Sequence, residues 1–311
     1  MKSVLVLLST YNGERFLREQ LDSLYSQINV NVQILARDDG SKDGTRDILS
    51  EYQKSKGQLT IIDGSNIGAA NSFFRLVEYA SEYCHQYDYY AYCDQDDVWF
   101  REKLEKAVNL LEKSDNHYKL AYSSLTTTDE YLTQLGSDTV DGTVYTLNSN
   151  IVSNHIAGCC QVFNRGLLEK INLINSYKTN RRITFLHDTW TSLVAFALDG
   201  YIIHDSFPRM YYRQHSGNVV GNNKGGLLHL YKKRISRYIN AESRPKSDKC
   251  KCIQDLMWNE IPYKNRPFID LCANYHDNIL KKLKLIFSTQ LYASSMGENI
   301  GALILVLFNK F

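Results

Sequence analysis

The amino-acid sequence contains no hydrophobic run long enough to cross a lipid bilayer, which needs about 20 consecutive apolar residues. The apolar stretch 4–8 is too short for the hydrophobic core of a signal peptide, and no cleavage site follows it. A second apolar run, 300–308, also falls far short of a membrane span. We therefore expect a cytoplasmic protein whose first apolar run is a buried β-strand.

The sequence also has little net charge and no organised set of cysteines. Its 36 basic and 34 acidic side chains give a formal net charge of +2, which does not indicate a nucleic-acid partner. The seven cysteines show neither a disulfide framework nor the CxxC spacing of structural zinc sites, so we expect reduced thiols. Apolar residues make up 43% of the 311 residues, which suffices for one large α/β domain with an appendage or for two modest domains.

The first 125 residues alternate between strand-like and helix-like patterns joined by short connections. The predicted strands cover 3–8, 32–37, 59–62, 89–93 and 120–123. The predicted helices cover 14–27, 69–83 and 103–113, with another that begins near Asp43. This alternation predicts an α/β fold with a doubly wound, mostly parallel sheet. Ligands bind at the carboxyl ends of the strands of such a sheet, so the residues that follow each strand are site candidates.

The middle of the chain, about 126–220, is less regular. Further strands are predicted at 159–163, 201–204 and 209–213. Further helices are predicted from Arg165 and over 188–198. From residue 225 onward the pattern is helical and rich in basic side chains. No internal repeat and no low-complexity segment is present.

An acidic segment, Cys93-Asp94-Gln95-Asp96-Asp97, directly follows a predicted strand. Three carboxylates within four residues repel one another unless something neutralises them. Mg²⁺ or Mn²⁺ resolves this repulsion, because both ions prefer oxygen ligands and accept substrate phosphates as further ligands. The alternative is a solvated acidic turn in which Asp97 caps the next helix.

The segment RDDGSKDGT, residues 37–45, follows the second predicted strand. Gly40 permits a tight turn, and Ser41 or Asp43 can cap the following helix. The turn does not explain two carboxylates at the strand end. A carboxylate such as Asp39 can instead accept a hydrogen bond from a base N–H or from a ribose hydroxyl.

Small polar residues end the first strand, at Thr10, Tyr11 and Asn12. They let the backbone approach a nucleotide, and Tyr11 is expected near the base. The loop after the third strand contains Asn66 and Gly68. Two interpretations of this loop stay open: a simple turn, or a contact with the sugar-nucleotide donor.

Together these segments resemble the family 2 glycosyltransferases of the GT-A fold. The pattern is STYN at the end of the first strand, DDGSxDGT about thirty residues later, and DxDD about fifty-five residues beyond that. The resemblance covers 1–220 and implies a nucleotide-binding half, 1–125, and an acceptor half, 126–220. Residues 221–311 then form a helical, basic C-terminal region.

The resemblance also implies roles for individual residues. In the segment HDTW, Asp188 matches the catalytic base, although a lone Asp at this place is ordinarily a helix-starting residue that the helix dipole favours. In the later segment RQHSGN, residues 213–218, a His completes the metal shell or touches the diphosphate, and an Arg neutralises phosphate charge. The residues assigned to the metal are Asp94, Asp96, Asp97 and His215. Those assigned to the donor are Thr10, Tyr11, Asn12, Asp39, Asn66, Gly68, Asp94 and Arg213. Those assigned to the acceptor are Gly158, Trp99, His187 and Trp190; for Trp99, packing is the alternative.

The forms CDQDDVW, HDTW and RQHSGN most resemble bacterial rhamnosyltransferase-like members that assemble capsules, cell-wall polysaccharides and O-antigens. The resemblance implies dTDP-L-rhamnose as the leading donor, followed by UDP-hexoses, with Mn²⁺ or Mg²⁺ as cofactor. The sugar is transferred with inversion to a hydroxyl of a growing, lipid-linked glycan, and Asp188 takes the proton of that hydroxyl.

Three other functions fit the sequence less well. A nucleotidyltransferase that forms sugar nucleotides usually has a glycine-rich, basic loop after its first strand, which STYNGERF is not. A processive polysaccharide synthase needs several membrane spans and a QxxRW motif, and the sequence has neither. A non-catalytic sugar-binding module does not need carboxylates at three strand ends.

The basic C-terminal region carries two groups of cations and then an apolar tail. The groups are Lys232, Lys233, Arg234 and Arg237, and then Arg244, Lys246, Lys249 and Lys251. One interpretation is docking on the anionic inner face of the cell membrane, where a lipid-linked acceptor resides. The other is a solvated helical face, with the tail packed on the core or on the partner subunit of a homodimer.

Overall fold

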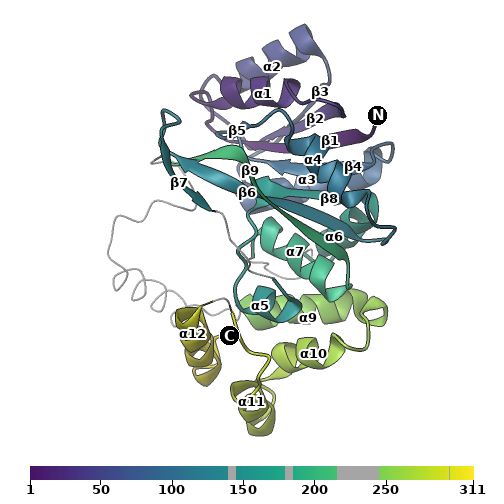
Figure 1. Ribbon diagram of the computed structural model, residues 1–311, viewed down its shortest axis with the longest axis vertical. Coiled ribbons are helices and arrows are strands. Elements are labelled where there is room, and N and C mark those ends of the chain that lie inside the picture. The colour runs from purple at the N-terminus through teal and green to yellow at the C-terminus, as the bar shows by residue number, and fades with distance from the viewer. Residues whose placement is uncertain (139–144, 179–184, 216–244, 294) are drawn as a thin grey trace.

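The computed structural model of the chain describes residues 1–138, 145–178, 185–215, 245–293 and 295–311 (Figure 1). Its strands are β1 (Ser3–Thr10), β2 (Asn31–Asp38), β3 (Leu59–Asp63), β4 (Tyr89–Cys93), β5 (Val98–Trp99), β6 (Lys119–Thr128), β7 (Gln134–Asp138), β8 (Gln161–Asn164) and β9 (Tyr201–Arg213). Its helices are α1 (Leu17–Tyr25), α2 (Thr45–Lys56), α3 (Ala69–Tyr83), α4 (Lys103–Leu111), α5 (Leu147–Val152), α6 (Arg165–Lys178), α7 (His187–Ala197), α9 (Pro245–Met257), α10 (Arg266–Asn274), α11 (Ile279–Ile286) and α12 (Met296–Leu307). Two short 3₁₀ helices, η1 (Gly158–Cys160) and η2 (Trp258–Glu260), complete the described elements.

The strands form one sheet in the order β3-β2-β1-β4-β8-β6-β9-β5, with β7 paired to β6. The strands from β3 to β4 are parallel, as are β6 and β9, whereas β8 runs antiparallel to both of its neighbours. A strand of a parallel sheet that is covered on both faces reads as a continuous apolar run, which explains the run in β1. The side chains of β1 alternate between two cores: Leu5 and Leu7 pack with α3, whereas Val4, Val6 and Leu8 pack with α1, α2 and α4.

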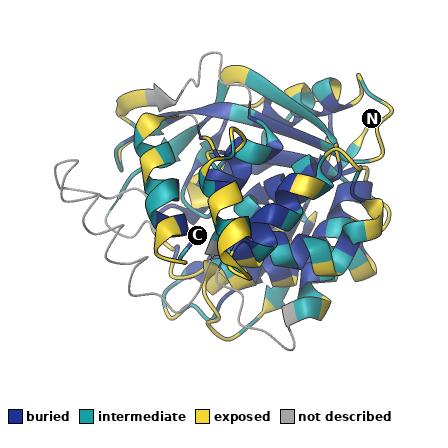
Figure 2. Ribbon diagram, turned by 90° about the horizontal axis from the view of Figure 1, so that it is seen from below, coloured by how far each residue is buried: buried dark blue, intermediate teal, exposed yellow. Residues whose placement is uncertain are grey.

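The α/β class, the mostly parallel sheet and the helical C-terminal extension were predicted correctly. Helices α9 and α10 pack beyond α5, α6 and α7, on the side of the molecule away from β1–β3 (Figure 1). Figure 2, which views the molecule from this side, shows both buried and exposed residues along the helices nearest the viewer. Within the described ranges, no helix combines the length and the apolar character that a membrane crossing requires.

Several element boundaries differ from the prediction. Residues 201–213 form one strand rather than two, because a shift in its pairing with β6 near Ser124 absorbs the irregular residues between Asp205 and Pro208. The predicted strand 159–163 begins only at Gln161, since η1 precedes it. Strands β5 and β7 were not predicted, because they are short or lie at an edge and carry no clear alternation.

Candidate active site

The polar segments that follow β1, β2 and β4 meet at one edge of the sheet. The parallel register pairs Thr10 with Asp38 and Leu8 with Cys93, so the three strands end side by side. Gln95 joins two of these segments: it accepts a hydrogen bond from the backbone N–H of Tyr11 at 2.8 Å and donates one to the Tyr11 carbonyl at 3.0 Å. These two hydrogen bonds hold the ends of β1 and β4 together.

The turn after β2 is closed by the first of its two strand-end carboxylates. Asp38 accepts hydrogen bonds from the backbone N–H of Ser41 at 3.0 Å and from the Thr10 hydroxyl at 3.2 Å. Asn12 braces the same turn, because its amide oxygen accepts from the backbone N–H of Lys42 at 2.9 Å. Asp38 therefore fills the structural role of the motif, and buried Thr10 serves this turn.

Asp39, predicted to bind the nucleoside, is buried and faces the protein. Its carboxylate pairs with Arg37 at 2.5 Å and accepts from the backbone N–H groups of Ile67 at 3.0 Å and Gly68 at 2.9 Å. A carboxylate offers about four acceptor positions, so a base N–H has to share an oxygen that is already used. In this structure Asp39 anchors the loop that carries Asn66 and Gly68.

Four of the predicted donor residues are exposed at the rim of this edge, and three of them, Tyr11, Asn12 and Asn66, carry a side chain. Tyr11 is 43% exposed, and Asn12 and Asn66 are exposed as well. Their side chains are accessible to a nucleotide. We keep them as the proposed donor contacts.

A compact cluster of ligand atoms lies beneath this rim. Ligand atoms of Asp94, Asp97 and Cys159 lie within 4.8 Å of one another. Asp97 is fully buried; its Oδ1 accepts from the backbone N–H of Arg213 at 3.1 Å, whereas its Oδ2 has no hydrogen-bond partner among the described residues. Burial raises the pKa of Asp94 to about 7, helped by repulsion from Asp96 and Asp188. Burial likewise raises the pKa of Asp97 well above its ordinary value.

This cluster suits a divalent cation. A buried carboxylate oxygen without a donor is costly unless a positive charge or a proton compensates it. Carboxylate oxygens are ligands for Mg²⁺ and Mn²⁺, and a nearby thiol adds a softer ligand. The prediction of a metal site at Asp94 and Asp97 therefore stays a proposal that the geometry supports, with Cys159 as an additional candidate ligand.

Asp96 and His215, also predicted as metal ligands, form a separate pair beside the cluster. The Nε2 atom of His215 lies 2.8 Å from Oδ2 of Asp96, and the His215 ring lies 4.9 Å from the Phe16 ring. His215 lies two residues beyond the end of β9 and is the last described residue of this segment. The neighbouring residues 216–218 of the predicted RQHSGN motif lie outside the described residues.

Arg213 was predicted to neutralise donor phosphate, and the structure gives its side chain a different position. The guanidinium is buried and donates to Glu19 at 2.5 Å, to the Glu130 carbonyl at 2.5 Å and to the Asp96 carbonyl at 2.9 Å. The planar guanidinium directs its N–H groups to these three acceptors. Arg213 is therefore corrected to a residue that holds the acidic loop in place.

Asp188 begins α7 and lies next to η1. Because β8 is antiparallel to β4, the residues before β8 lie beside the end of β4, which brings Gly158 and Cys159 to the acidic loop. A Cβ atom on Gly158 would lie 2.6 Å from Nε2 of His187 and 3.3 Å from Cβ of Asp188, so only glycine fits. Burial raises the pKa of Asp188, although the backbone N–H of Thr189 donates to it at 2.5 Å.

His187 packs under this site rather than into open space. Its ring lies 3.9 Å from the Phe73 ring in a stacked arrangement and 4.7 Å from the Tyr92 ring edge-on. Gly158, predicted to leave room for a sugar, leaves room for His187. The proposed acceptor side is thus built from the base Asp188 and the close approach of η1 to α7.

The two tryptophans predicted to contact the acceptor are in the core. Trp99 is 2% exposed and lies under the Lys103 ammonium, 4.2 Å from its ring centre. Trp190 is 0% exposed, stacks on Phe185 and donates its indole N–H to the Ile171 carbonyl at 3.1 Å. In this structure neither ring is accessible to an acceptor, and for Trp99 the packing alternative is the arrangement observed.

Sequence reasoning missed four residues that the structure brings to the site. They are Gln95, Lys103, Cys159 and Lys249. The buried ammonium of Lys103 donates to the Cys159 carbonyl at 2.6 Å and so fixes η1 under the acidic loop. Burial lowers the pKa of Lys249 to about 8, with Asp188 among the groups that oppose this shift. Gln95 stood inside the acidic motif, but nothing in the spacing of the other three pointed to the site.

Known proteins resemble this chain in sequence and in fold. Residues 5–172, more than half of the chain, match the family described as Glycosyl transferase family 2. The dTDP-rhamnosyl transferase RfbG of Shigella flexneri is 29% identical over 249 residues, which cover 75% of this chain and 84% of that protein. The putative teichuronic acid biosynthesis glycosyltransferase TuaG of Bacillus subtilis is 26% identical over 226 residues, which cover 70% of this chain and 82% of that protein.

Solved structures share the fold at low sequence identity. The S. aureus TarS 1–349 structure in complex with UDP-GlcNAc has a TM-score of 0.53 and 14% identity, and the match covers 98% of this chain and 90% of that chain. The mannosyltransferase PcManGT of Pyrobaculum calidifontis, in complex with GDP-Man and Mn²⁺, has a TM-score of 0.51 and 18% identity, with 98% and 74% covered. The strand-end motifs, the fold and the match over more than half of the chain agree, and the chain belongs to glycosyl transferase family 2.

Proposed function

We propose that this glycosyltransferase moves a sugar from a nucleoside-diphosphate donor to a hydroxyl of a growing bacterial surface polysaccharide, with inversion at the anomeric carbon. One observation carries the proposal: η1 lies between the two groups, since Cys159 is within 4.8 Å of the ligand atoms of Asp94 and Asp97, and a Cβ atom on the adjacent Gly158 would lie 3.3 Å from Cβ of Asp188. A site for the leaving diphosphate and a base for the acceptor thereby adjoin each other.

In this mechanism Asp188 accepts the proton of the acceptor hydroxyl as its oxygen attacks the anomeric carbon. The raised pKa of Asp188 suits a base, since burial makes its carboxylate more basic than an exposed one. Tyr11, Asn12 and Asn66 hold the nucleoside at the rim, and Asp39 fixes the loop of Asn66. Positioning of both substrates supplies much of the rate enhancement.

Asp94 and Asp97, with Cys159, Asp96 and His215 nearby, are the residues that would hold a Mn²⁺ or Mg²⁺ ion. When bound, such an ion stabilises the negative charge on the leaving nucleoside diphosphate. Arg213 and Lys103 keep the acidic loop and η1 in place around it. Residues 1–125 serve the donor in this scheme, and 126–220 serve the acceptor.

The names of the relatives support a choice of substrates. RfbG is named a dTDP-rhamnosyl transferase, and TuaG is named for teichuronic acid biosynthesis. We therefore propose dTDP-L-rhamnose as the first donor to test and UDP-hexoses as the second. The proposed acceptor is a lipid-linked glycan at the inner face of the cell membrane.

Two C-terminal helices support the membrane part of this proposal. Ile279 and Leu280 of α11 are 64% and 76% exposed, and Phe287, which directly follows the helix, is 80% exposed. The same helix carries Lys281, Lys282 and Lys284. The neighbouring α12 exposes Met296, Ile300, Leu307 and Phe308. An exposed apolar face flanked by lysines suits an anionic lipid surface. The earlier group of Lys232, Lys233 and Arg234 lies outside the described residues.

The test is release of free nucleoside diphosphate from a panel of sugar nucleotides, with Mn²⁺ or EDTA present. We expect hydrolysis of dTDP-L-rhamnose or of one UDP-hexose, lost in EDTA and in Asp97→Ala. Asp188→Asn should abolish transfer to an acceptor while the donor still binds. Formation of a sugar nucleotide and pyrophosphate from a nucleoside triphosphate would instead make the protein a nucleotidyltransferase.

A further inference from the structure

A cavity lies between the β6–β9 part of the sheet and the loops that flank the C-terminal helices α10 and α11. It is an open groove of about 780 Å³. Its aromatic lining consists of Tyr122, Tyr145, Phe196, His204 and Tyr292. None of these residues belongs to the candidate active site. Helix α7 links the two places, since Asp188 begins it and Phe196 lies near its end.

Several of the aromatic rings that line the groove pack against one another. The rings of Tyr122 and His204 stack at 4.7 Å with an interplanar angle of 14°, and the Tyr145 ring lies 6.1 Å from that of Tyr122. On the other wall Tyr292, from the loop after α11, reaches Thr146, with 3.3 Å between the hydroxyl oxygens. A tyrosine ring offers an apolar face and a polar edge, which together complement the C–H faces and the hydroxyls of sugars.

The polar lining is mostly uncharged. The amide side chains of Asn148, Asn265 and Gln290 line the groove. Asn265 donates through Nδ2 to the carbonyls of Phe196 at 3.2 Å and Ala197 at 3.0 Å, which fixes its side chain. Asp199 and Lys264 also line the groove, and they form an ion pair at 2.6 Å in which their opposite charges cancel.

The imidazole of His204 also lines the groove, and burial lowers its pKa, which disfavours its charged form. Among the described lining residues, Lys264 is the one lysine or arginine, and it is already paired with Asp199, whereas a phosphate ligand needs unpaired cations. The same described lining is not continuously apolar, as an acyl chain requires.

From these features we infer that the groove binds several units of a glycan chain. Its volume lies within the roughly 300–1,000 Å³ that ligand sites occupy. On α7, Phe196 follows Asp188 by eight residues, which is a rise of about 12 Å along the helix axis. A chain whose terminal hydroxyl is at Asp188 then places its earlier sugars in the groove. The identification of this chain as the acceptor rests on the proposed function, whereas the binding itself does not.

The test measures equilibrium binding of linear hexasaccharides of rhamnose, glucose, mannose and N-acetylglucosamine to the full chain without donor. Tyr292→Ala removes one ring, and because that residue is 42% exposed we expect the variant to fold. Binding of the preferred hexasaccharide should weaken about five- to tenfold, in line with the loss of one aromatic contact. Tyr292→Phe keeps the ring and should retain most of the affinity. Tyr83→Ala, an exposed tyrosine outside the groove, is the matched control and should not change it.

The possible results distinguish a failure of the groove inference from a failure of the proposed function. Hexasaccharide binding that is weakened by Tyr292→Ala alone supports the groove, even where no sugar nucleotide is hydrolysed. If none of the four hexasaccharides binds, or if Tyr292→Ala and Tyr83→Ala bind equally well, the inference is overturned. In that case continued hydrolysis of a sugar nucleotide leaves the proposed function intact.

Discussion

At the scale of single residues, Asp97 has an unusual environment. It is buried, and its Oδ2 accepts no hydrogen bond from the part of the chain that the structure describes. A buried charge of this kind lowers the stability of the free protein, and a bound cation relieves that cost. Removal of this carboxylate is therefore expected to raise the stability of the metal-free protein and to weaken its binding of the metal.

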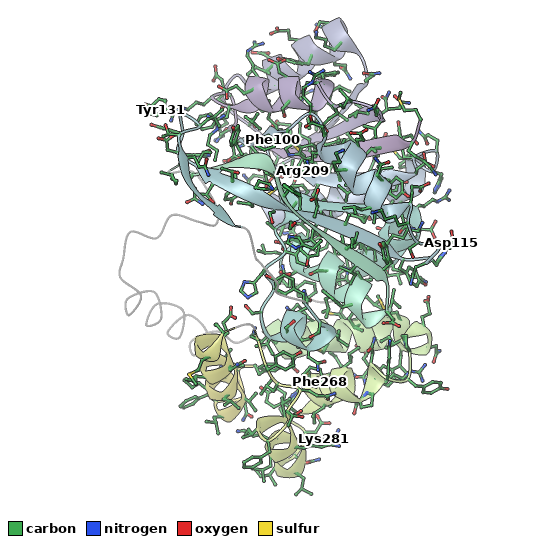
Figure 3. All side chains as sticks on the ribbon, viewed as in Figure 1. Phe100, Asp115, Tyr131, Arg209, Phe268 and Lys281 are labelled. Atoms are coloured by element: carbon green, nitrogen blue, oxygen red, sulfur yellow. The ribbon has the colours of Figure 1, made fainter. Side chains whose placement is uncertain are left out.

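Asp97→Asn should raise the Tm of the metal-free protein by about 2–5 °C, because the amide carries no charge to bury. The same variant should lose most of the stabilisation that Mn²⁺ gives the wild type. Thermal unfolding with and without Mn²⁺ measures both effects. Asp115→Asn, an exposed site at the opposite edge of the sheet, is the control (Figure 3). A lower Tm together with an unchanged response to Mn²⁺ would contradict this assignment.

Lys249 gives Asp188 a buried positive neighbour from the C-terminal region. It is 6% exposed on α9, a helix that packs against α7. Its charge lowers the pKa of Asp188, whereas burial raises it. Asp94 is the nearby negative group that interacts with Asp188. Lys249 is accordingly a positioning residue that keeps the proposed base ionised.

Lys249→Met should move the acid limb of the kcat/KM profile upward by about 0.5–1 pH unit. The sign follows because Asp188 must be deprotonated to act, and loss of the positive neighbour raises its pKa. The ammonium itself loses its proton near its own pKa of about 8, so wild type and variant should converge above that pH. The pH profiles of both proteins and of Lys249→Arg measure the effect. An unshifted acid limb in Lys249→Met would remove Lys249 from the site.

At the scale of elements, the site depends on where η1 meets the start of α7. Gly158 contacts His187 so closely that an added methyl group cannot fit. Lys103 holds the other side of η1 through the Cys159 carbonyl. The acidic loop and the base are thus set relative to each other by one short 3₁₀ turn.

Gly158→Ala should lower kcat for transfer about 100-fold, because displacement of α7 by even about 1 Å misplaces the base. Donor binding should change little, since the donor contacts lie on the loops after β1, β2 and β3. Gly136→Ala is the matched control, because a methyl group there meets no atom within 4 Å. Transfer kinetics and donor affinity, measured on both variants, decide the matter. Equal kcat values in the two would show that the approach of η1 to α7 is unimportant for catalysis.

At the scale of the whole molecule, the exposed apolar side chains of α11 and α12 lie at the end remote from β1–β3 (Figures 1 and 3). Lys281 is at this end, and Tyr131 is at the other (Figure 3). A protein that docks through this end keeps its sheet away from the lipid. The proposed acceptor site then lies between the lipid surface and the nucleotide-binding strands.

Replacement of Leu280 and Phe287 by Glu should abolish co-sedimentation with anionic phosphatidylglycerol vesicles. Each replacement removes an apolar side chain that would enter the lipid and adds a negative charge that the anionic lipid repels. Donor hydrolysis should be unaffected. Leu135→Glu, an exposed apolar residue on β7, serves as the control and should still co-sediment. Retained vesicle binding by the double variant, or a dimer that only the wild type forms, would assign this surface to another role.

The sequence by itself determined the α/β class, the strand ends and the family. These features are local: an apolar run such as 4–8 or 89–93 identifies a buried strand, and the polar motif that follows it identifies a strand end. Parallel strands then bring 10–12, 38–39 and 94–97 to one edge without further information. Asp188 came from the resemblance, since its local pattern alone indicates only a helix start.

Only the tertiary structure decided which side chains complete the site and which do not. The insertion of antiparallel β8 between β4 and β6 brings Cys159 to Asp97, and α9 brings Lys249 to Asp188. The same packing turned Trp99 and Trp190 inward and closed Arg213 onto Glu19. The proposed glycan groove likewise combines five separate chain segments. The physical reason is that periodicity along a chain reports which face of an element is buried, whereas contacts between distant elements depend on strand order and on the path of the connections.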